Sequence, residues 1–252
     1  MDRKHFAGAV LLGFGLVPAA ISQAGRALPS AEKVLDRYVA VSGGQAAYDR
    51  VQSEVKTTTI TVSGAKVAET VSYITRNGNF RFIARGAGGQ SDLGVNDGVA
   101  WTRSAERAEI LETGEDRAQA LQSAELLPEG HWRKYYKSVE MLGTDAVDGR
   151  PCYKLKAVPF AGEPHTLWYD QRTGLQVKEM EPVPGGGEAE MTAGEYFESG
   201  GIRLPHVFQV QMNGVVLTTT VDQVRFEEAI PDSVFALPPD IERLMKRRFS
   251  TK

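Results

Sequence analysis

The chain has 252 residues, of which 42% are hydrophobic and 24% charged; this balance excludes a disordered chain and suffices for one large domain or two small ones. Its formal net charge of −3 gives no basic excess that could neutralise a phosphate backbone, so we expect no nucleic-acid partner. The single cysteine, Cys152, excludes an internal disulfide, and its alternating neighbours predict a small buried hydrophobe.

The first residues have the pattern of a secretory signal. Arg3 and Lys4 precede an apolar run over residues 6–21, and the small residues Ser22 and Ala24 follow it, as a signal peptidase requires. The run is short for a membrane span. We predict that residues 1–24 are a signal peptide cleaved after Ala24, and the alternative is an uncleaved membrane anchor.

Helical patterns come next in the chain. Ser30 can cap a helix that Gly43 and Gly44 end. A shorter helix is expected over residues 45–51. A third is expected over residues 116–127, because its alanines and leucines are spaced for one helical face.

Strand patterns fill most of the remainder, from Glu54 to Phe226. Apolar and polar residues alternate there with a period of two, which predicts roughly ten strands. Four residue pairs favour tight hairpins because both of their residues tolerate a positive φ; they are Asn77-Gly78, Asp97-Gly98, Asp148-Gly149 and Asn213-Gly214. Since no βαβ rhythm occurs, the sequence predicts an antiparallel sheet.

Asp170, in the stretch "WYDQRTGLQVKEM", stands between two of these strands. It is either a catalytic carboxylate or the first residue of a turn. The following Arg-Thr-Gly favours a turn, in which the aspartate side chain accepts hydrogen bonds from the backbone ahead of it. We therefore predict a structural role.

The residues offer no recognisable catalytic or metal-binding set. His131, His165 and His206 are isolated from one another, and no His-Glu-x-x-His or Cys-x-x-Cys motif occurs, so a metal site would have to be assembled from distant strands. Ser91 lacks the Gly-x-Ser-x-Gly pattern of a serine hydrolase. We expect no catalytic residue, metal or cofactor, and an unrecognised hydrolase is an alternative.

Several strands carry apolar side chains on one face only. Phe80 and Phe82 alternate with Arg81, for example, so one face of the sheet is apolar. This face is either a filled core under the helices or the wall of a ligand cavity. The candidates for a cavity wall are Phe80, Phe82, Trp101, Tyr153, Leu155, Val210 and Met212.

The basic tail over residues 241–252 alternates apolar residues with Arg and Lys. It is either a short amphipathic helix that touches anionic lipid or a frayed, solvated end, and we expect the frayed end. Residues 25–240 are expected to form a single domain.

Four segments identify a resemblance to a known family. In order they are "SVEMLGTDAVDGRPCYKLKA", "TLWYDQRTGLQVKEM", "GEYFESGGIRLPHVFQV" and "FEEAIPDSVFALP". With the first helix, they resemble the outer-membrane lipoprotein-sorting proteins, relatives of periplasmic lipoprotein carriers of the LolA/LolB type. The resemblance covers about residues 30–238, and its motifs are turns and strand pairs, which specify a fold rather than an activity.

The resemblance implies a mainly β fold with a few helices, in which a curved antiparallel sheet forms an unclosed half-barrel covered by those helices. It also implies a periplasmic, monomeric protein that holds lipoprotein acyl chains or lipid in the cleft between sheet and helical lid. Its partners would be membrane-bound donor and acceptor proteins, with lid opening, acyl capture and downhill transfer. The alternative is a protein-interaction or sensor module whose cavity is filled.

Overall fold

The computed structural model describes residues 27–160, 162–182, 187–212 and 214–249. The predicted signal peptide, residues 1–24, lies outside the described residues. Within the described part of the chain, no helix has the length and apolar character needed to cross a membrane.

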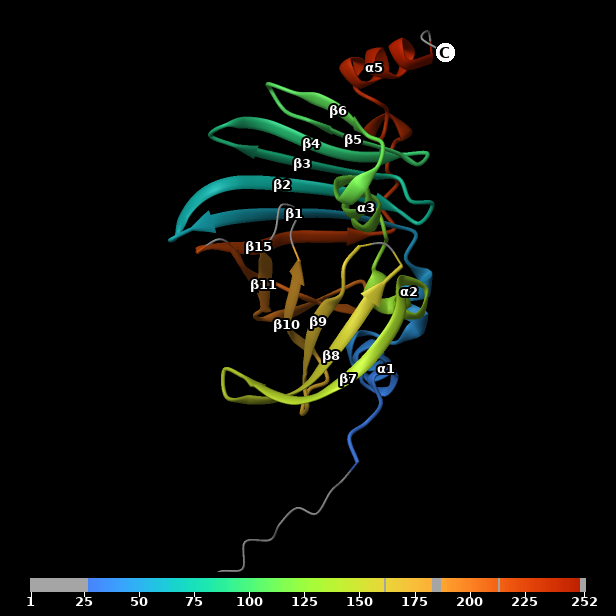
Figure 1. Ribbon diagram of the computed structural model, residues 1–252. Coiled ribbons are helices and arrows are strands. Elements are labelled where there is room, and N and C mark those ends of the chain that lie inside the picture. The colour runs from blue at the N-terminus through green and yellow to red at the C-terminus, as the bar shows by residue number, and fades with distance from the viewer. Residues whose placement is uncertain (1–26, 161, 183–186, 213, 250–252) are drawn as a thin grey trace, which may run out of the picture.

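One antiparallel sheet of 13 strands dominates the structure, and the prediction of an unclosed half-barrel is confirmed (Figure 1). The strands of its first half are β1 (Ser53–Val62), β2 (Ala65–Thr75), β3 (Phe80–Gly86), β4 (Gly89–Asn96), β5 (Val99–Arg103) and β6 (Ala108–Leu111). Those of its second half are β7 (Tyr136–Val147), β8 (Arg150–Pro159), β9 (His165–Asp170), β10 (Gln176–Pro182), β11 (Glu188–Ala193), β14 (Val207–Met212) and β15 (Val215–Phe226). The strands β12 (Tyr196–Ser199) and β13 (Ile202–Pro205) form a separate hairpin.

The strand order places β6 at one edge of the sheet and β7 at the other, with β1 paired to β15 in the middle. Since β6 and β7 are consecutive in the chain, the connection between them must cross from edge to edge. It does so through α3 (Gly114–Ser123), the 3₁₀ turn η1 (Pro128–His131) and α4 (Trp132–Tyr135), which we call the lid. Figure 1 shows α3 in front of β1 and β2, and α3 contacts β4, β5 and β6 of the first half of the sheet.

The N-terminal helices α1 (Ala31–Ser42) and α2 (Gln45–Arg50) confirm the first two helical predictions. The Ser30 hydroxyl accepts a hydrogen bond from the Lys33 N–H at 3.4 Å, as a helix cap should. The buried face of α1 includes Leu35 and Tyr38, and Tyr38 contacts Tyr169 of β9 edge to face. This helix therefore joins the main hydrophobic core on the inner face of the sheet.

The turn at Asp170 has the predicted structural role. Asp170 is buried, and its Oδ1 accepts hydrogen bonds from the backbone N–H groups of Arg172 at 2.9 Å and Thr173 at 2.6 Å. The Arg37 guanidinium of α1 donates to the carbonyl oxygens of Gln171 and Arg172 at 2.8 and 2.7 Å. The turn thus fastens α1 to the β9–β10 hairpin.

The prediction for Cys152 is also confirmed, since it is free and fully buried.

Of the four predicted hairpin pairs, Asp97-Gly98 and Asp148-Gly149 have positive φ at both residues, as expected. At the first pair only Gly78 has a positive φ. There the loop between β2 and β3 is longer, with the Gly78 N–H donating to the Thr75 carbonyl at 2.9 Å. Asn213 of the fourth pair lies outside the described residues.

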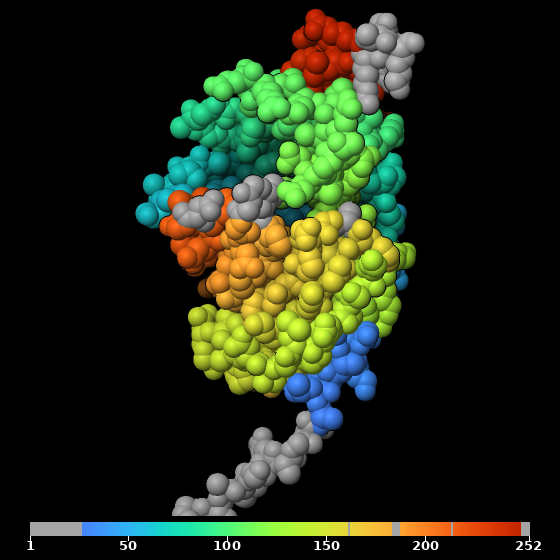
Figure 2. Space-filling model, viewed as in Figure 1, coloured from blue at the N-terminus to red at the C-terminus, as the bar shows by residue number. Residues whose placement is uncertain are grey.

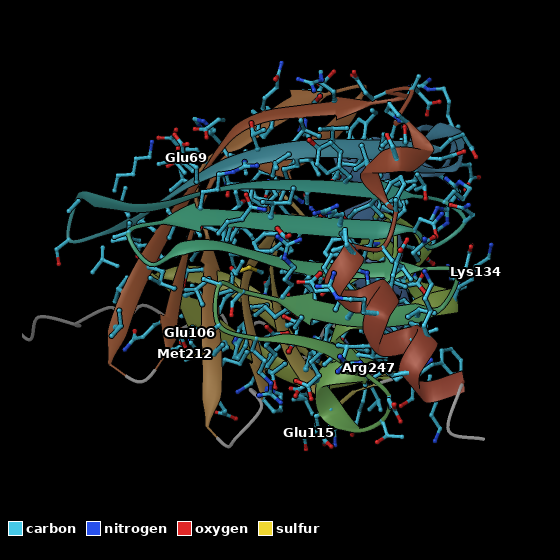
Figure 3. The ribbon with its side chains drawn as sticks, turned by 90° about the horizontal axis from the view of Figure 1, so that it is seen from above. Glu69, Glu106, Glu115, Lys134, Met212 and Arg247 are labelled. Atoms are coloured by element: carbon cyan, nitrogen blue, oxygen red, sulfur yellow. The ribbon has the colours of Figure 1, made fainter. Side chains whose placement is uncertain are left out.

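The expectation of a frayed C-terminal end is wrong. After the short η2 (Asp232–Val234), the chain forms α5 (Pro239–Phe249). Ile241 of this helix is fully buried, and Asp240 forms an ion pair of 3.4 Å with Arg103 of β5. Figure 3 shows α5 lying across one end of the strands. Burial of Ile241 explains the ordered helix, because a solvated end would leave that side chain in water.

The packing of the lid on α2 gives a stability prediction. Gly130 of η1 is buried, and an added Cβ would overlap the ring of Tyr48, which is itself fully buried and hydrogen-bonded through its hydroxyl to Ser42 Oγ at 2.7 Å. Because the ring cannot move aside, we expect Gly130→Ala to lower the free energy of unfolding by about 1–3 kcal/mol. Urea denaturation measures the change.

Gly88→Ala is the matched control, since a Cβ at Gly88 would meet nothing within 4 Å. This variant should stay within about 0.5 kcal/mol of the original protein. Equal stability of the two variants would contradict the close packing of the lid on Tyr48.

Candidate functional site

Two adjoining cavities lie between the lid and the inner face of the sheet. The first, of about 300 Å³, is called the apolar cavity. The second, of about 570 Å³, is called the polar cavity. Both are lined by Gln122 and Ser123 at the end of α3, so together they form one cleft beneath the lid. Figure 2 shows the surface hollowed beside the lid, between the two halves of the sheet.

The apolar cavity takes its walls from the middle of the sheet, the β12–β13 hairpin and the lid. Its apolar lining consists of Ile74, Leu127, Leu204, Phe208, Val221 and Val224. Register explains why they meet, because Ile74 of β2 pairs with Glu54 of β1, and cross-strand partners project to the same face. The middle of the sheet therefore presents a mainly apolar floor to the lid, interrupted by the charged side chains of β1.

Four charged side chains also line the apolar cavity, and they are Glu54, Lys56, Glu125 and Glu129. Glu54 and Lys56 of β1 form an ion pair of 3.0 Å in which Glu54 is 3% exposed. The nearby Glu54 carboxylate raises the pKa of Lys56 and outweighs the opposing effect of burial. Glu129 of η1 faces the same space, and burial, with a smaller contribution from repulsion by Glu54, raises its pKa to about 7. Glu129 thus gains or loses a proton near neutral pH.

Leu127 marks the point where the lid passes the apolar cavity. Its φ of 50° and ψ of 58° lie in the left-handed region, which a leucine adopts only at an energetic cost. Its side chain is buried at the cavity wall. Burial of the leucine thus holds a strained backbone at the junction of α3 and η1.

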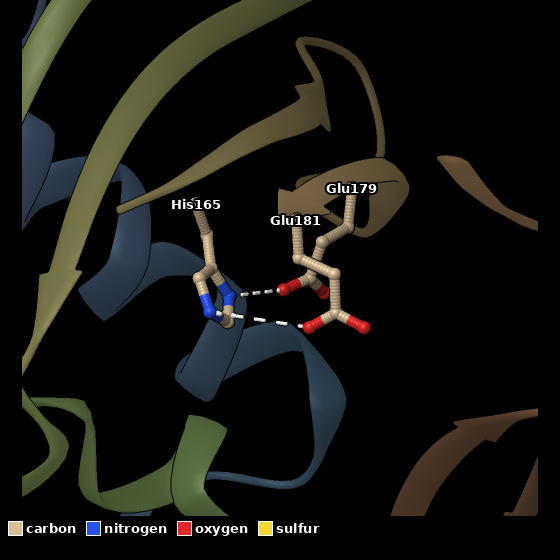
Figure 4. A group of neighbouring side chains, drawn as sticks. All are labelled: His165, Glu179 and Glu181. Carbon is tan, nitrogen blue, oxygen red and sulfur yellow. Dashed lines mark hydrogen bonds and ion pairs between the residues drawn. The ribbon is translucent and has the colours of Figure 1, made fainter. Parts of the chain in front are cut away.

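The polar cavity lies between α3 and the β9–β10 hairpin. His165 of β9 stands opposite the end of β10, where Glu179 and Glu181 project to the same face (Figure 4). His165 Nδ1 lies 2.7 Å from Glu179 Oε1, and His165 Nε2 lies 3.9 Å from Glu181 Oε2. From the lid, Gln122 Nε2 comes within 3.4 Å of His165 Nε2 and also donates to the Tyr135 hydroxyl.

The electrostatics of this trio follow from its burial and its two carboxylates. Burial alone would lower the pKa of His165, but the hydrogen bond to Glu179 and the negative charges of Glu179 and Glu181 raise it. Burial, followed by repulsion from Glu179, raises the pKa of Glu181. The trio is therefore an acid–base group, and two of its members, His165 and Glu181, line the polar cavity.

Sequence analysis missed this trio, because Glu179 follows His165 by 14 residues along the chain and no local motif connects them. The signal was present in the hairpin itself. A turn at Asp170 pairs Thr166 with Met180, and the alternation of side chains then puts His165, Glu179 and Glu181 on one face. Only a known register makes this inference possible.

The residues expected to line a cavity lie elsewhere. Phe80 and Leu155 are buried in the main core, and Phe82 and Tyr153 pack against that core. Val210 and Met212 are half-buried on β14, on the same face as the cavity residue Phe208. None of these six lines the apolar or the polar cavity, although Tyr153 lines a smaller one of about 220 Å³ beneath α1.

Trp101 lies on the opposite face of the sheet from Phe80. It pairs with Gly94, which pairs with Arg81, whereas Phe80 pairs with Val95. The Arg81 guanidinium stacks 5.5 Å from the Trp101 ring, and it bonds to Asp92 at 3.1 Å. Gly94 leaves room for the indole, because a Cβ at that position would collide with it. Trp101 therefore packs on the outer face.

The raised pKa of Glu129 predicts a pH-dependent stability. The folded state holds the Glu129 proton up to about pH 7, whereas an unfolded chain releases it near the ordinary glutamate pKa of 4.5, so the free energy of unfolding falls as pH rises through this window. Glu129→Gln removes the titration. Between pH 5 and pH 8, the original protein should lose on the order of 1–3 kcal/mol relative to this variant. Urea denaturation at both pH values measures the difference.

Glu125→Gln, at an exposed glutamate of the same connection, is the control and should titrate in parallel with the original protein. A difference between Glu129→Gln and the original protein that does not change with pH would contradict the assignment.

No family model matches the sequence, and no curated protein matches it. Solved structures do resemble it. A LolA superfamily protein from Nitrosomonas europaea has a TM-score of 0.58 at 12% identity, over 83% of this chain and 99% of that one. A DUF1329 family protein from Desulfovibrio piger has a TM-score of 0.55 at 14% identity, over 82% and 97%.

A third structure, described as an outer-membrane lipoprotein-sorting protein domain from Vibrio parahaemolyticus, has a TM-score of 0.54 at 12% identity, over 81% of this chain and 97% of that one. In all three cases the similarity extends over nearly the whole of the other chain. At these identities the likeness establishes architecture and not activity. The protein therefore has the LolA-like fold.

Proposed function

We propose that this protein is an exported, periplasmic binding protein that takes up a hydrophobic ligand, an acyl chain of a lipid or lipoprotein, in the apolar cavity. The observation that carries the proposal is the apolar floor of Ile74, Phe208 and Val221 beneath the lid, in a fold that leaves the sheet open. Apolar clefts with a few charged groups are the usual sites for such ligands. Removal of residues 1–24 and a single domain over residues 25–240 belong to the same proposal.

The size of the apolar cavity fits reversible binding. At about 300 Å³ it lies at the lower end of the range for ligand pockets, roughly 300–1,000 Å³, and so holds part of an acyl chain. Six to eight buried methylenes would contribute roughly 5–6 kcal/mol, at about 0.8 kcal/mol each, before the cost of ordering the chain. Such binding permits transfer to a better acceptor.

The α3 part of the lid is the element that would move. The η1–α4 part is held by Asp36 of α1, which accepts hydrogen bonds from Arg133 Nη1 and Nη2 at 2.7 and 2.8 Å and from Trp132 Nε1 at 3.2 Å. In contrast, α3 itself buries only Ala120. Opening would thus displace α3 about the strained Leu127 while η1 and α4 stay in place. Capture and downhill transfer between membrane-bound donor and acceptor proteins need no covalent step.

Filling the junction of the two cavities tests the proposal. Ser123 is half-buried on α3 and lines both cavities, so Ser123→Trp should place an indole in the cleft and spare the core. We expect it to weaken binding of a fluorescent fatty acyl probe by about tenfold or more, because the bulk excludes the chain. Probe titration measures the affinity.

Ser123→Ala is the matched control, because it loses only the hydrogen bond to the Gln119 carbonyl. It should bind the probe within roughly twofold of the original protein. With the fold retained by circular dichroism, equal binding by Ser123→Trp would place the probe outside the cleft.

Native mass spectrometry with lipid extraction, on protein purified from a periplasm, identifies the natural ligand. Bound lipid that the acyl probe displaces supports the proposal. A folded protein with neither bound lipid nor probe binding would be a protein-interaction or sensor module.

A further inference from the structure

The β9–β10 hairpin arranges His165 as a metal ligand. For Nε2 to bind a metal, the proton of the imidazole must reside on Nδ1, and a hydrogen-bond acceptor there fixes that tautomer. Glu179 Oε1 lies 2.7 Å from Nδ1. The other oxygen of Glu179 is held by Gln176 Nε2 at 3.0 Å, so the carboxylate is fixed on both sides. The Glu179 carboxylate therefore orients the imidazole so that His165 Nε2 points away from Glu179.

Two further groups face Nε2. Glu181 Oε2 lies 3.9 Å from it, and the Gln122 side-chain amide lies at 3.4 Å. In a tetrahedral zinc site, bonds of about 2.0–2.2 Å separate two ligand atoms by roughly 3.4 Å. Glu181 needs to move by only about half an ångström to share an ion with Nε2. Rotation of the Gln122 amide would bring its oxygen to the third position.

The charge of the surroundings favours a cation. Glu115 and Glu163 line the same cavity as Glu181, and neither lysine nor arginine occurs among the described residues that line it. With a neutral imidazole, the trio itself carries two negative charges. The Glu179 side chain is 18% exposed, so its charge is screened less than it would be in bulk water, whereas the more exposed Glu181 remains accessible to an ion from solvent.

We infer that the polar cavity binds a divalent transition-metal ion, Zn²⁺ in the first instance, through His165 Nε2 and the Glu181 carboxylate. Glu179 is a positioning residue that orients the imidazole. Imidazole and carboxylate together suit Zn²⁺ better than Mg²⁺, which prefers oxygen ligands. The inference goes beyond acyl binding and does not depend on it, because neither His165 nor Glu181 lines the apolar cavity.

Calorimetric titration of the full chain, without a histidine tag and after dialysis against a chelator, tests the site. We expect one Zn²⁺ to bind saturably and Mg²⁺ to bind far more weakly. Glu181→Gln removes a ligand at constant size and should weaken Zn²⁺ binding by at least about tenfold, and Glu179→Gln should weaken it by about 10- to 100-fold. Glu115→Gln, at an exposed position of the same cavity, should bind as the original protein does.

Three results would overturn the inference. They are the absence of Zn²⁺ binding by the folded original protein, undiminished binding by Glu181→Gln, and an equal loss in Glu115→Gln, which would indicate diffuse attraction to carboxylates. Absence of Zn²⁺ binding would mean that His165 and Glu179 form an ion pair with a purely structural role. If a variant does not fold, the visible absorption of Co²⁺ added to the original protein tests the site instead. Intense bands would support the inference, because they require a low-coordinate metal site. Their absence would overturn it.

Discussion

The two edges of the sheet are consecutive in the chain, and the rest of the structure depends on this. β6 and β7 lie at opposite ends of a 13-strand order, so the 24 residues numbered 112–135 between them must span the mouth of the half-barrel. An unclosed sheet would expose its apolar inner face to water. The crossing segment covers that face and becomes the lid. The cleft is the space that this cover leaves unfilled.

The lid is held to the rest of the protein more firmly at η1 and α4 than at α3. At η1 and α4 the lid is secured by the packing of the Tyr48 ring against Gly130 and by the hydrogen bonds from Trp132 and Arg133 to Asp36 of α1. At α3 few side chains are buried. Charged side chains line both cavities, among them Glu129 in the apolar cavity and Glu181 in the polar one. The apolar cavity also has a wall of Leu, Ile, Val and Phe side chains, which the polar cavity lacks. One cleft thus offers a mainly apolar and a mainly polar environment side by side.

The sequence predicted features that depend on local chemistry. The Asp170 turn, the Ser30 cap and the paired positive φ at Asp97-Gly98 each follow from one side chain and its immediate neighbours. Features that depend on strand register were not accessible. On β5, Ala100 lies in the main core and the next residue, Trp101, projects to the outer face. An error of one residue in the predicted register therefore assigns Trp101 to the wrong face. The same limit concealed the His165 trio, whose members meet only once β9 and β10 are aligned.

The pairing of β1 with β15 has a consequence for how the protein forms. These strands are the first and last of the sheet, and Glu54 pairs with Phe226. Each half of the sheet is built from neighbours in sequence, but the halves join through strands at opposite ends of the chain. Contacts this distant form late, because a long loop must close first. A ribosome or translocation channel would therefore release nearly the entire polypeptide before the two halves could join, and until then no ligand could be enclosed.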